Sequence, residues 1–574
     1  MSLCLSRRAM RMMRVAARAS SLLACAIFAA LAIQRGPPAP PEGSGIERDV
    51  QYAFVLVGML ATLAAWRFPG LGGALLALTG VVLGVAAATR YSPATSLFVA
   101  LMFVTPGVLF VALWSSGRAL IVQAGAAAFI VLLLALGGRE AQSRHEAAFG
   151  PAHPSSPLET MPIDRVLWVW AGATTSTGFE IRAKVTHSSD KVRLVVSRSP
   201  DLANAVYSDF ATAASDANRV ASPGIDGLEP LTTYYYGVEV DGTLDEYQRG
   251  EIKTFPNGAA SFTIAFAACA RSGSNGAVYD AIRTAEPLLY VVTGDLHYEN
   301  IDTNDLRKFR SAYDRVLTSP AQSALYRRTS IAYTWDDHDY GGNNSDSTSR
   351  SRTTARLSYR ETVPHYDLPA GAGNDAIYQA FSVGRVRFIL TDTRSERNAE
   401  SAPGGGKSML GSRQLTWLKQ ELLAASRSHS LVVWVNPDPW ISSGDLGGDD
   451  WGAFASERRD IADFIATNGI RNLVMLSGDA HMIAADDGSN SDYSSGGGAG
   501  FPVFHAAALD RPGSVKCGPY SEGTFAGAGQ FGLLSVEDDG KGPVSVTFRG
   551  MDYASRELVS YTFTVPAPAA AVAP

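Results

Sequence analysis

Six short apolar segments of the chain each end in residues that can bind a metal ion or a phosphate group. The densest ending follows Ile331–Trp335 and is a row of four ionisable residues: Asp336, Asp337, His338 and Asp339. Left unpaired at the end of a buried strand, such a cluster would carry a large desolvation cost. We therefore expect a positive group beside it, with a metal ion as the leading candidate.

The other five endings carry a similar set of donors. They are Cys269 and Arg271 after Phe262–Ala268, Asp295, His297 and Tyr298 after Leu288–Val292, Asp392 and Arg394 after Val386–Leu390, Asn436 and Asp438 after Leu431–Val435, and Asp479 and His481 after Leu473–Leu476. A single Gly-Asp pair would indicate only a turn. Because ligands gather at the carboxyl ends of strands in layered α/β folds, the repetition predicts one shared site.

The donor types indicate which ions such a site would prefer. Asp295 follows a glycine turn and could bridge two ions, while Tyr298 could reach one of them as a phenolate. A phenolate and a carboxylate beside a thiolate favour Fe³⁺ over Mg²⁺. A neighbouring site made only of Asp and Asn oxygens favours a harder ion such as Ca²⁺.

The elements that would position these residues change character along the chain. After Thr254, apolar runs alternate with longer helical segments such as Gln414–Ser426, which predicts an α/β domain over 257–565. Over 164–256, short alternating runs predict an antiparallel β-sandwich. Within it, Leu228–Tyr236 resembles the late-strand tyrosine region of fibronectin type III-like modules.

Residues 1–138 form a predicted membrane segment with four or five transmembrane helices. The apolar stretches are Ser21–Ile33, Val50–Trp66, Gly70–Ala88, Thr95–Trp114 and Ala119–Leu136. The last three have the ~20 residues that cross a bilayer. The first follows five arginines and is either a signal peptide or a short first membrane helix. A linker is expected over 139–163, and an Ala/Pro-rich tail over 566–574.

Charge sets the expected orientation and partners. The N-terminal arginines place the N-terminus in the cytoplasm, and both readings of the first stretch put the soluble part on the outer face of the membrane. The lipid bilayer is thus an expected partner. The net charge of −6 and the 18% of charged residues give no basic surface for nucleic acid.

Four blocks of the sequence together resemble those of PhoD-like alkaline phosphatases and phosphodiesterases, within the calcineurin-like metallophosphoesterase superfamily. They are Cys269-Ala-Arg271, Gly294-Asp295-x-x-Tyr298, Trp335-Asp-Asp-His-Asp339 and Gly478-Asp479-x-His481. The resemblance runs from Asp164 to Thr564. It implies a layered αββα catalytic domain that hydrolyses phosphate monoesters, phosphate diesters or both with a metal-activated water.

The resemblance also implies a role for each site residue. Cys269, Asp295, Tyr298 and His481 would hold an iron-like ion, with Asp295 bridging to further ions, expected to be calcium, at Asn343, Asp479 and Asp337. His338 would face the leaving group or a phosphate oxygen, and Arg271 and Arg394 would donate to the phosphate. The block with Asn436 and Asp438 departs from the family pattern, and its role stays open.

Several alternatives remain at this point. Arg394 could instead pair with Asp392, His297 is expected outside the ligand set, and Asp336 and Asp339 are expected to orient their neighbours. At the level of the whole chain, the alternative is a non-catalytic membrane-anchored binding or sensor protein that uses the β module. Such a protein would be expected to have lost the metal-binding residues of the four blocks, and in this sequence they are present.

Overall fold

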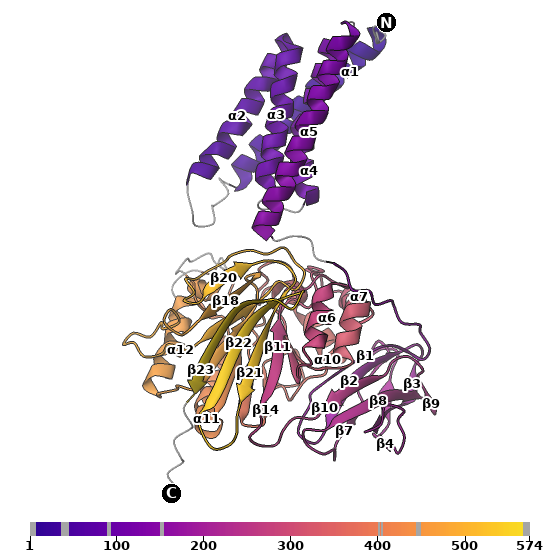
Figure 1. Ribbon diagram of the computed structural model, residues 1–574, viewed down its shortest axis with the longest axis vertical. Helices are drawn as coiled ribbons and strands as arrows, with labels where there is room; N and C mark the ends of the chain where they lie inside the picture. The colour runs from indigo at the N-terminus through magenta and orange to yellow at the C-terminus, as the bar shows by residue number, and fades with distance from the viewer. Residues whose placement is uncertain are drawn as a thin grey trace. The chain divides into compact units, whose positions relative to one another are not determined.

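The chain folds into two compact units, Met1–Pro151 and Ala152–Pro574, in a computed structural model (Figure 1). The structure describes residues 7–35, 45–88, 93–116, 118–149, 154–399, 402, 406–442 and 449–565. The division falls inside the predicted linker, but helix α5 (Leu120–Phe149) continues past Gly138, so the first part of that linker is helical. The predicted tail, 566–574, lies outside the described residues.

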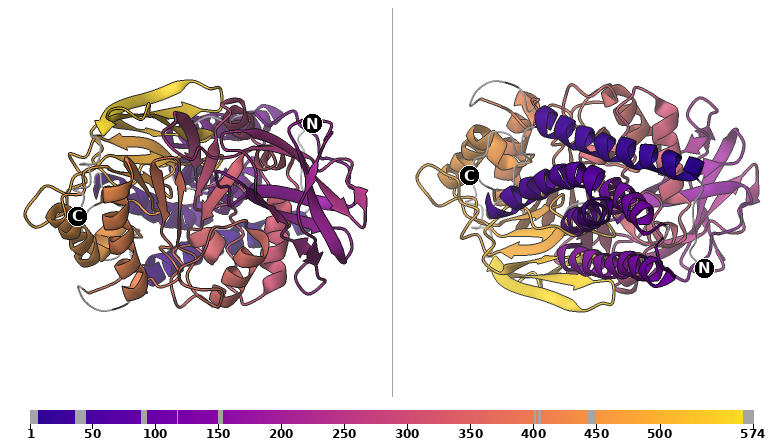
Figure 2. Two further views of the ribbon diagram at one scale, coloured as in Figure 1. Left: turned by 90° about the horizontal axis from the view of Figure 1, so that it is seen from below. Right: turned by 90° about the horizontal axis from the view of Figure 1, so that it is seen from above.

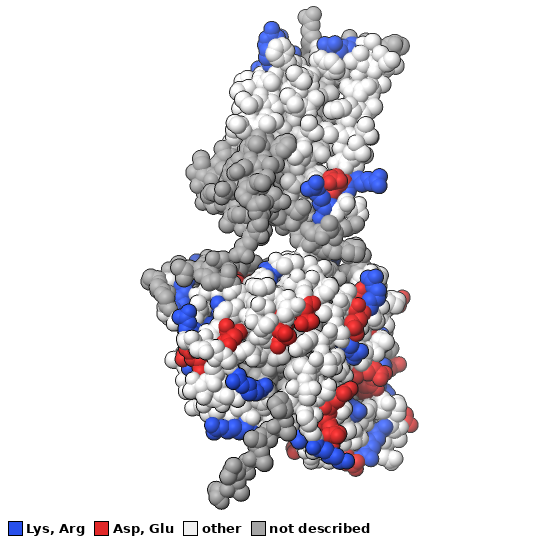
Figure 3. Space-filling view, turned by 60° about the vertical axis from the view of Figure 1, so that its left-hand side comes forward, with Lys and Arg blue, Asp and Glu red and all other residues white. Residues whose placement is uncertain are grey.

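The first unit is helical. It contains α1 (Arg7–Arg35), α2 (Gly45–Arg67), α3 (Pro69–Ala87), α4 (Pro93–Ser115) and α5. Among the described residues, 3 segments are long and apolar enough to cross a membrane: Pro69–Ala87, Ser96–Ser115 and Leu120–Arg144. By length and composition this is fewer than the four or five spans predicted. Figure 3 shows this unit as a largely uncharged surface with charged side chains toward its ends.

Glycines bring α3 and α4 into close contact. A Cβ at Gly80 would lie 2.6 Å from the Ala100 oxygen, and a Cβ at Gly107 would lie 2.6 Å from the Ala77 nitrogen. Neither partner atom can yield, because both belong to the backbone. Such close approach through small residues is typical of helix pairs in membranes, where packing rather than water exclusion drives association.

Three sheets build the second unit. The 10-stranded sheet runs β23 (Glu557–Val565), β22 (Val544–Asp552), β21 (Gln530–Glu537), β11 (Phe262–Ala267), β12 (Leu289–Thr293), β13 (Ser330–Thr334), β1 (Val166–Gly172), β2 (Phe179–Val185) and β6 (Val220–Ala221), with β7 (Gly224–Ile225) on β2. The 7-stranded sheet runs β14 (Gln379–Val383), β15 (Val386–Leu390), β16 (Leu431–Val435), β17 (Leu473–Ser477), β19 (Val503–Ala506), β18 (Met482–Asp486) and β20 (Gly523–Ala526). The 6-stranded sheet runs β10 (Gly250–Lys253), β8 (Thr233–Val240), β3 (Ser189–Ser197) and β4 (Val206–Tyr207), with β5 (Ala211–Ala213) and β9 (Thr243–Leu244) beside it.

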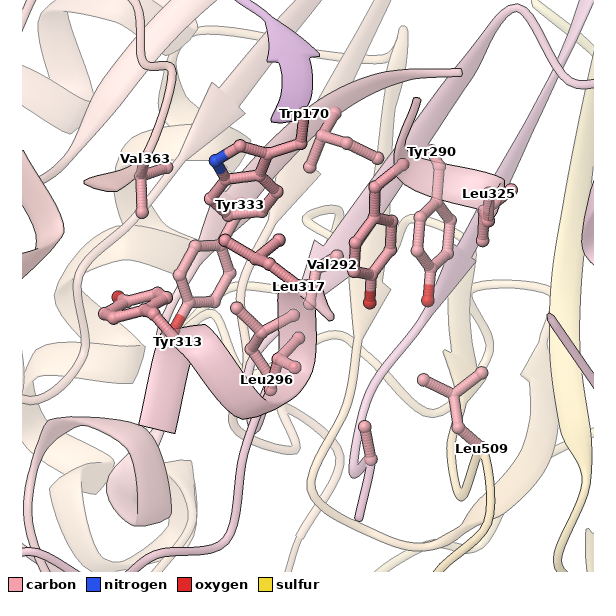
Figure 4. Close-up of a cluster of buried hydrophobic side chains, with 14 of the residues drawn as sticks. Trp170, Tyr290, Val292, Leu296, Tyr313, Leu317, Leu325, Tyr333, Val363 and Leu509 are labelled. Carbon is pink, nitrogen blue, oxygen red and sulfur yellow. The ribbon is translucent and has the colours of Figure 1, made fainter. Parts of the chain in front are cut away.

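Strand alternation explains how the two larger sheets pack. Val291 of β12 and Val433 of β16 point into a common core between the sheets. The two neighbours of Val291 in β12, Tyr290 and Val292, point to the other face of the sheet. There they join a cluster with Tyr313 and Leu317 of α7 (Leu306–Leu317), as Figure 4 shows. Because successive side chains of a strand face opposite sides, both faces of each fully apolar strand are buried.

Helices cover the outer faces of both sheets. On the 10-stranded sheet lie α6 (Ala277–Thr284), α7, α8 (Pro320–Tyr326) and α10 (Arg352–Thr362), and on the 7-stranded sheet lie α11 (Gly411–Ser428) and α12 (Ala455–Thr467). Figure 2 shows the orange and the pink helices on opposite sides of the strands. The short helices α9 (Asp337–Tyr340) and η1 (Trp451–Phe454) follow strand ends near the site described below.

The predicted β-sandwich is present but is not a separate domain. Its two sheets enclose a core that includes Val169 and Tyr236. However, β1 also pairs in parallel with β13, with Gly172 opposite Ile331, so one sheet of the sandwich continues into the larger sheet. The indole of Trp170 donates to the Thr362 oxygen at 2.8 Å and ties the junction to α10. The boundary predicted at 256 therefore separates elements that share a sheet.

Candidate metal centre

Two glycines allow the strand ends of both large sheets to meet. Gly478 follows β17, and a Cβ there would lie 2.4 Å from the Thr293 backbone oxygen and 2.7 Å from the Ala268 Cβ. Gly294 follows β12, and a Cβ there would lie 2.5 Å from the Asp336 Cβ. No larger residue fits at either position without moving its neighbours. The aspartate that follows each glycine thereby reaches the junction of the sheets.

The backbone turns sharply at four of the predicted ligands. Cys269, Asp295, Asp479 and His481 have φ values of 64°, 55°, 58° and 52°. Non-glycine residues rarely adopt this left-handed conformation, which costs roughly 1–3 kcal/mol at each position. The surrounding structure therefore holds the four side chains against a local conformational preference, as is common at functional sites.

The turns bring two groups of metal-binding atoms together. Donor atoms of Cys269, Asp295 and His481 all lie within 4.8 Å of one another, and so do those of Asp295, Asp337 and His338. The Cys269 thiol lies 3.5 Å from the Asp295 Oδ2. Asp295 is common to both groups, so its two oxygens could serve two ions. The donor set thus fits a binuclear centre.

His481 turns an unprotonated nitrogen toward the first group. Its Nδ1–H donates to the Pro512 oxygen at 2.7 Å, and burial lowers the pKa of the ring to about 4, so the ring is neutral. The Nε2 atom then accepts from the Tyr298 hydroxyl at 2.8 Å. A fixed tautomer with Nε2 turned to the site is the usual arrangement for a ligating histidine. Tyr298 is placed to reach the same ion.

His338 lies at the second group. Its Nδ1–H donates to the Asn300 Oδ1 at 2.5 Å, and its ring stacks on Tyr298 with centroids 3.9 Å apart. Burial lowers the pKa of His338, although the carboxylate of Asp337 opposes the shift. The neutral ring therefore keeps its Nε2 lone pair on the side of Asp295 and Asp337.

The chain supplies its own compensation for three of the five buried carboxylates here. Asp336 accepts from the Arg394 Nε at 2.6 Å, and Asp479 accepts from the Lys516 Nζ at 2.9 Å. Burial acts to raise the pKa of Asp479, but the ammonium of Lys516 outweighs it and lowers that pKa to about 2. Asp339 accepts three hydrogen bonds, from two backbone nitrogens and a tyrosine hydroxyl.

Asp295 and Asp337 accept backbone hydrogen bonds but have no lysine or arginine beside them in the described part of the chain. Within the described residues, neither carboxylate forms an ion pair with a lysine or arginine. Burial raises the pKa of Asp295 well above its usual range, and the charges of Asp337 and Asp339 raise it further. Burial also raises the pKa of the Cys269 thiol, with Asp295 adding to the shift. A cation between these groups would reverse those shifts.

Asn343 lies at the edge of this arrangement. Asp337 accepts from the Asn344 backbone nitrogen at 2.6 Å, which holds the loop against the second group. The Asn343 side chain is exposed and donates to the Asn344 amide oxygen. The structure thus holds the loop that carries Asn343 next to the second group, and the role of Asn343 as a metal ligand stays a prediction.

Arg394 corrects a prediction made from the sequence. Its side chain is 0% exposed, and its guanidinium donates to Asp336, Asp438 and Asp449. All three nitrogens thus donate to carboxylates of the protein, which gives Arg394 a structural role. The alternative partner, Asp392, does not pair with the Arg394 side chain. From Arg394 it accepts a hydrogen bond of the backbone nitrogen alone, at 3.1 Å. Arg394 is a buried counter-charge that joins the two sheets.

The open question about Asn436 and Asp438 also has an answer. The Asn436 oxygen accepts from the Trp451 indole at 3.1 Å, and its nitrogen donates to the Asp438 backbone oxygen. The Asp438 carboxylate accepts from Arg394 and from Arg397 at 3.0 Å. Both residues are fully buried, and these contacts give them a role in packing and charge pairing.

Arg271 and His297 remain from the predicted set. Arg271 is exposed, and its backbone nitrogen donates to the Asp510 carboxylate at 2.6 Å. Its role as a donor to the phosphate stays a prediction. His297 is 0% exposed, packs against Phe309 and Tyr313, and has a pKa that burial lowers to about 3. It is a neutral core residue outside the ligand set.

The sequence analysis missed the segment 510–517, which covers one side of the centre. It supplies the Pro512 oxygen that orients His481, the Lys516 ammonium on Asp479, and the Arg511 guanidinium, whose carbon lies 4.0 Å from the centre of the Tyr298 ring. These residues follow β19 and the apolar residues Ala507–Leu509, and β19 is parallel to β17, so they too lie beyond a strand end at this edge of the sheet. The strand-end pattern could therefore have indicated Asp510 and Arg511 as a further ending.

Comparison with known proteins agrees with the blocks identified in the sequence. Residues 264–516 match the family model of PhoD-like phosphatases. A curated relative, alkaline phosphatase D of Bacillus subtilis (strain 168), is 25% identical over 308 residues, which cover 45% of this chain and 52% of the relative. The chain thus spans about half the length of the curated relative that it matches.

The fold of the second unit is also that of a known structure. A solved structure of PhoD superimposes with a TM-score of 0.58 at 18% identity, covering 70% of this chain and 90% of that chain. A purple acid phosphatase, PPD1 from yellow lupin (Lupinus luteus) seeds, gives a TM-score of 0.47 at 11% identity over 71% of this chain and 75% of that chain. The sheet-rich unit therefore has a PhoD-like fold.

We expect Gly478→Ala to destabilise the protein by roughly 1–3 kcal/mol, because the new Cβ would meet a backbone oxygen that cannot move aside. Urea unfolding followed by circular dichroism measures the change. Gly542→Ala is the matched control, since a Cβ there has no atom within 4 Å. Equal stability of the two variants would contradict the close approach of the strand ends.

We expect Arg394→Met to cost about 3–5 kcal/mol, because it leaves buried carboxylates without a counter-charge. Arg394→Lys keeps the charge and should recover part of the loss, although it cannot form the same fork of hydrogen bonds. The exposed Arg459, changed to Met, is the control. A stable Arg394→Met variant with weakened phosphate binding would restore the original prediction for this residue.

Proposed function

We propose that the chain hydrolyses phosphate esters at a metal centre in which Asp295 is shared between two ions. The observation that carries the proposal is the presence of Asp295 in both groups of donor atoms, beside Asp337 and without a lysine or arginine partner for either carboxylate among the described residues. The match of residues 264–516 to PhoD-like phosphatases, which are metal-dependent, supports the same activity.

The proposed ligands divide by chemistry. Cys269, Asp295, Tyr298 and His481 would hold one ion, and Asp337, Asn343 and Asp479, with the other oxygen of Asp295, would hold the second ion or ions. Thiolate, phenolate and imidazole donors favour Fe³⁺ at the first position. Oxygen donors alone favour Ca²⁺ at the second. For Asp479 to bind there, the Lys516 ammonium must move away from it.

The ions would bind phosphate oxygens and activate water for in-line displacement. Among the side chains of the protein, His338 is the proposed proton acceptor and donor. Its Nε2 lone pair can accept a proton, and the neighbouring Asp337 stabilises the imidazolium that results. The protonated ring can then donate to the departing ester oxygen. Its stacking on Tyr298 and the hydrogen bond to Asn300 keep the ring in place.

We expect purified protein to contain bound metal and to hydrolyse aryl phosphate monoesters, diesters or both. Asp295→Asn should lose most of its metal and reduce kcat by at least about 100-fold, because it removes the shared charged ligand. Metal content and turnover measure the two effects. Asp539→Asn, an exposed aspartate, should keep both. A folded wild-type protein without metal and without turnover of either ester would contradict the proposed function.

We further propose that α3, α4 and α5 anchor the enzyme in a membrane, of the bacterial inner or plasma type, with the catalytic domain on the outer face. Their length and apolar composition support insertion. The exposed arginines of α1, among them Arg11 and Arg14, support a cytoplasmic N-terminus. We likewise propose that the sandwich over 164–256 is fibronectin type III-like and that the catalytic unit has αββα layering.

Protease treatment of intact spheroplasts tests the orientation. We expect a tag fused after the C-terminus to be digested without permeabilisation, because the positive-inside rule places the second unit outside. A cytoplasmic marker protein must survive the same treatment. Protection of the tag until the membrane is opened would place the catalytic unit in the cytoplasm instead.

A further inference from the structure

Arg511 lies beside the candidate centre with no partner for its charge among the described residues. Its guanidinium carbon is 4.0 Å from the centre of the Tyr298 ring, and that ring stacks on His338. Its Nε is buried and has no hydrogen-bond partner. No carboxylate of the described residues forms an ion pair with it.

The neighbouring buried or half-buried cations behave differently. Arg394 and Arg397 are both held by aspartates, and Lys516 is held by Asp479. These three cations balance the charge of the protein itself. Arg511 forms no ion pair with a carboxylate of the described residues, and a guanidinium has five N–H donors that need acceptors. An acceptor from outside the chain would satisfy them.

The backbone on both sides of Arg511 is fixed. The Asp510 carboxylate accepts from the Arg271 backbone nitrogen at 2.6 Å, and the Pro512 oxygen accepts from the His481 Nδ1 at 2.7 Å. Two residues further on, the Ser514 nitrogen donates to the His481 oxygen at 2.9 Å. The segment 510–517 is thus attached to the blocks that carry the donor atoms, and Arg511 is held at their side.

We propose that Arg511 binds a terminal oxygen of the substrate phosphate and makes the enzyme prefer monoesters, an inference that rests on the proposed function. A guanidinium donates two parallel hydrogen bonds to phosphate oxygens, which are stronger than neutral ones. A monoester phosphate carries about twice the negative charge of a diester near pH 8, and the attraction scales with that charge. Arg511 therefore stabilises bound monoesters more than diesters.

The test uses the full chain with its metals and compares Arg511→Met, Arg511→Lys and the exposed control Arg459→Met. Methionine keeps an apolar stem over Tyr298 but removes the charge. We expect Arg511→Met to bind inorganic phosphate about 10- to 100-fold more weakly, and to raise KM for an aryl monoester by a similar factor. KM for the diester should rise only about 3- to 10-fold, because half the charge gives half the free energy, and metal content should stay at the wild-type level.

Arg511→Lys should recover part of the phosphate affinity, because lysine restores the charge but cannot donate the two parallel hydrogen bonds of a guanidinium. Unchanged phosphate affinity in an Arg511→Met protein that retains its metal would overturn the inference. So would loss of metal in both variants, since Arg511 would then support the metal ligands, or equal effects on the monoester and the diester.

Failure of the proposed function would look different. If the wild-type protein hydrolysed neither ester, calorimetric titration with inorganic phosphate alone would still compare the variants. Weaker phosphate binding by Arg511→Met would then keep Arg511 as an anion-binding residue in a protein without esterase activity, and the monoester preference would be overturned.

Discussion

The burial of five carboxylates at the junction of two sheets is the constraint on which the site depends. Asp336, Asp339 and Asp479 are compensated by an arginine, by hydrogen-bond donors and by a lysine. Asp295 and Asp337 are left without an ion pair to lysine or arginine in the described part of the chain. Because an isolated buried charge is costly, the pair requires a cation that the chain does not supply. The compensated carboxylates around this pair thus leave Asp295 and Asp337 as the proposed place for a metal ion.

The need to compensate buried carboxylates also explains the role of Arg394. It reaches from the end of β15 to Asp336 at the end of β13, and so it joins the 7-stranded sheet to the 10-stranded sheet across the site. Glycines make the junction possible, since Gly478 lets β17 approach the end of β12 within backbone contact distance. Charge pairing and close approach together fix the distance between the two groups of donor atoms.

Much of this could be predicted from the sequence, and the physical reason is local. The ends of apolar strands gave the α/β unit and brought Cys269, Asp295 and His481 together, because parallel strands end at one edge of a sheet. The sequence could not predict the direction in which a side chain points or the pairing of segments that are far apart in the chain. The sequence places Arg394 at the right edge but does not show that its side chain turns inward. The ending after β19, which carries Arg511, is present in the sequence but follows a strand interrupted by His505. Likewise, the pairing of β1 with β13 joins segments far apart in the chain, which no local pattern indicates.

Anomalous X-ray scattering from crystals of the metal-loaded protein tests the central claim most directly. If Asp295 is shared by two ions, the anomalous map should show two peaks, one at Cys269 and His481 and one at Asp337, each next to a different oxygen of Asp295. Data collected on both sides of the iron edge should assign the first peak to iron. A single peak, or peaks that do not share Asp295, would contradict the account.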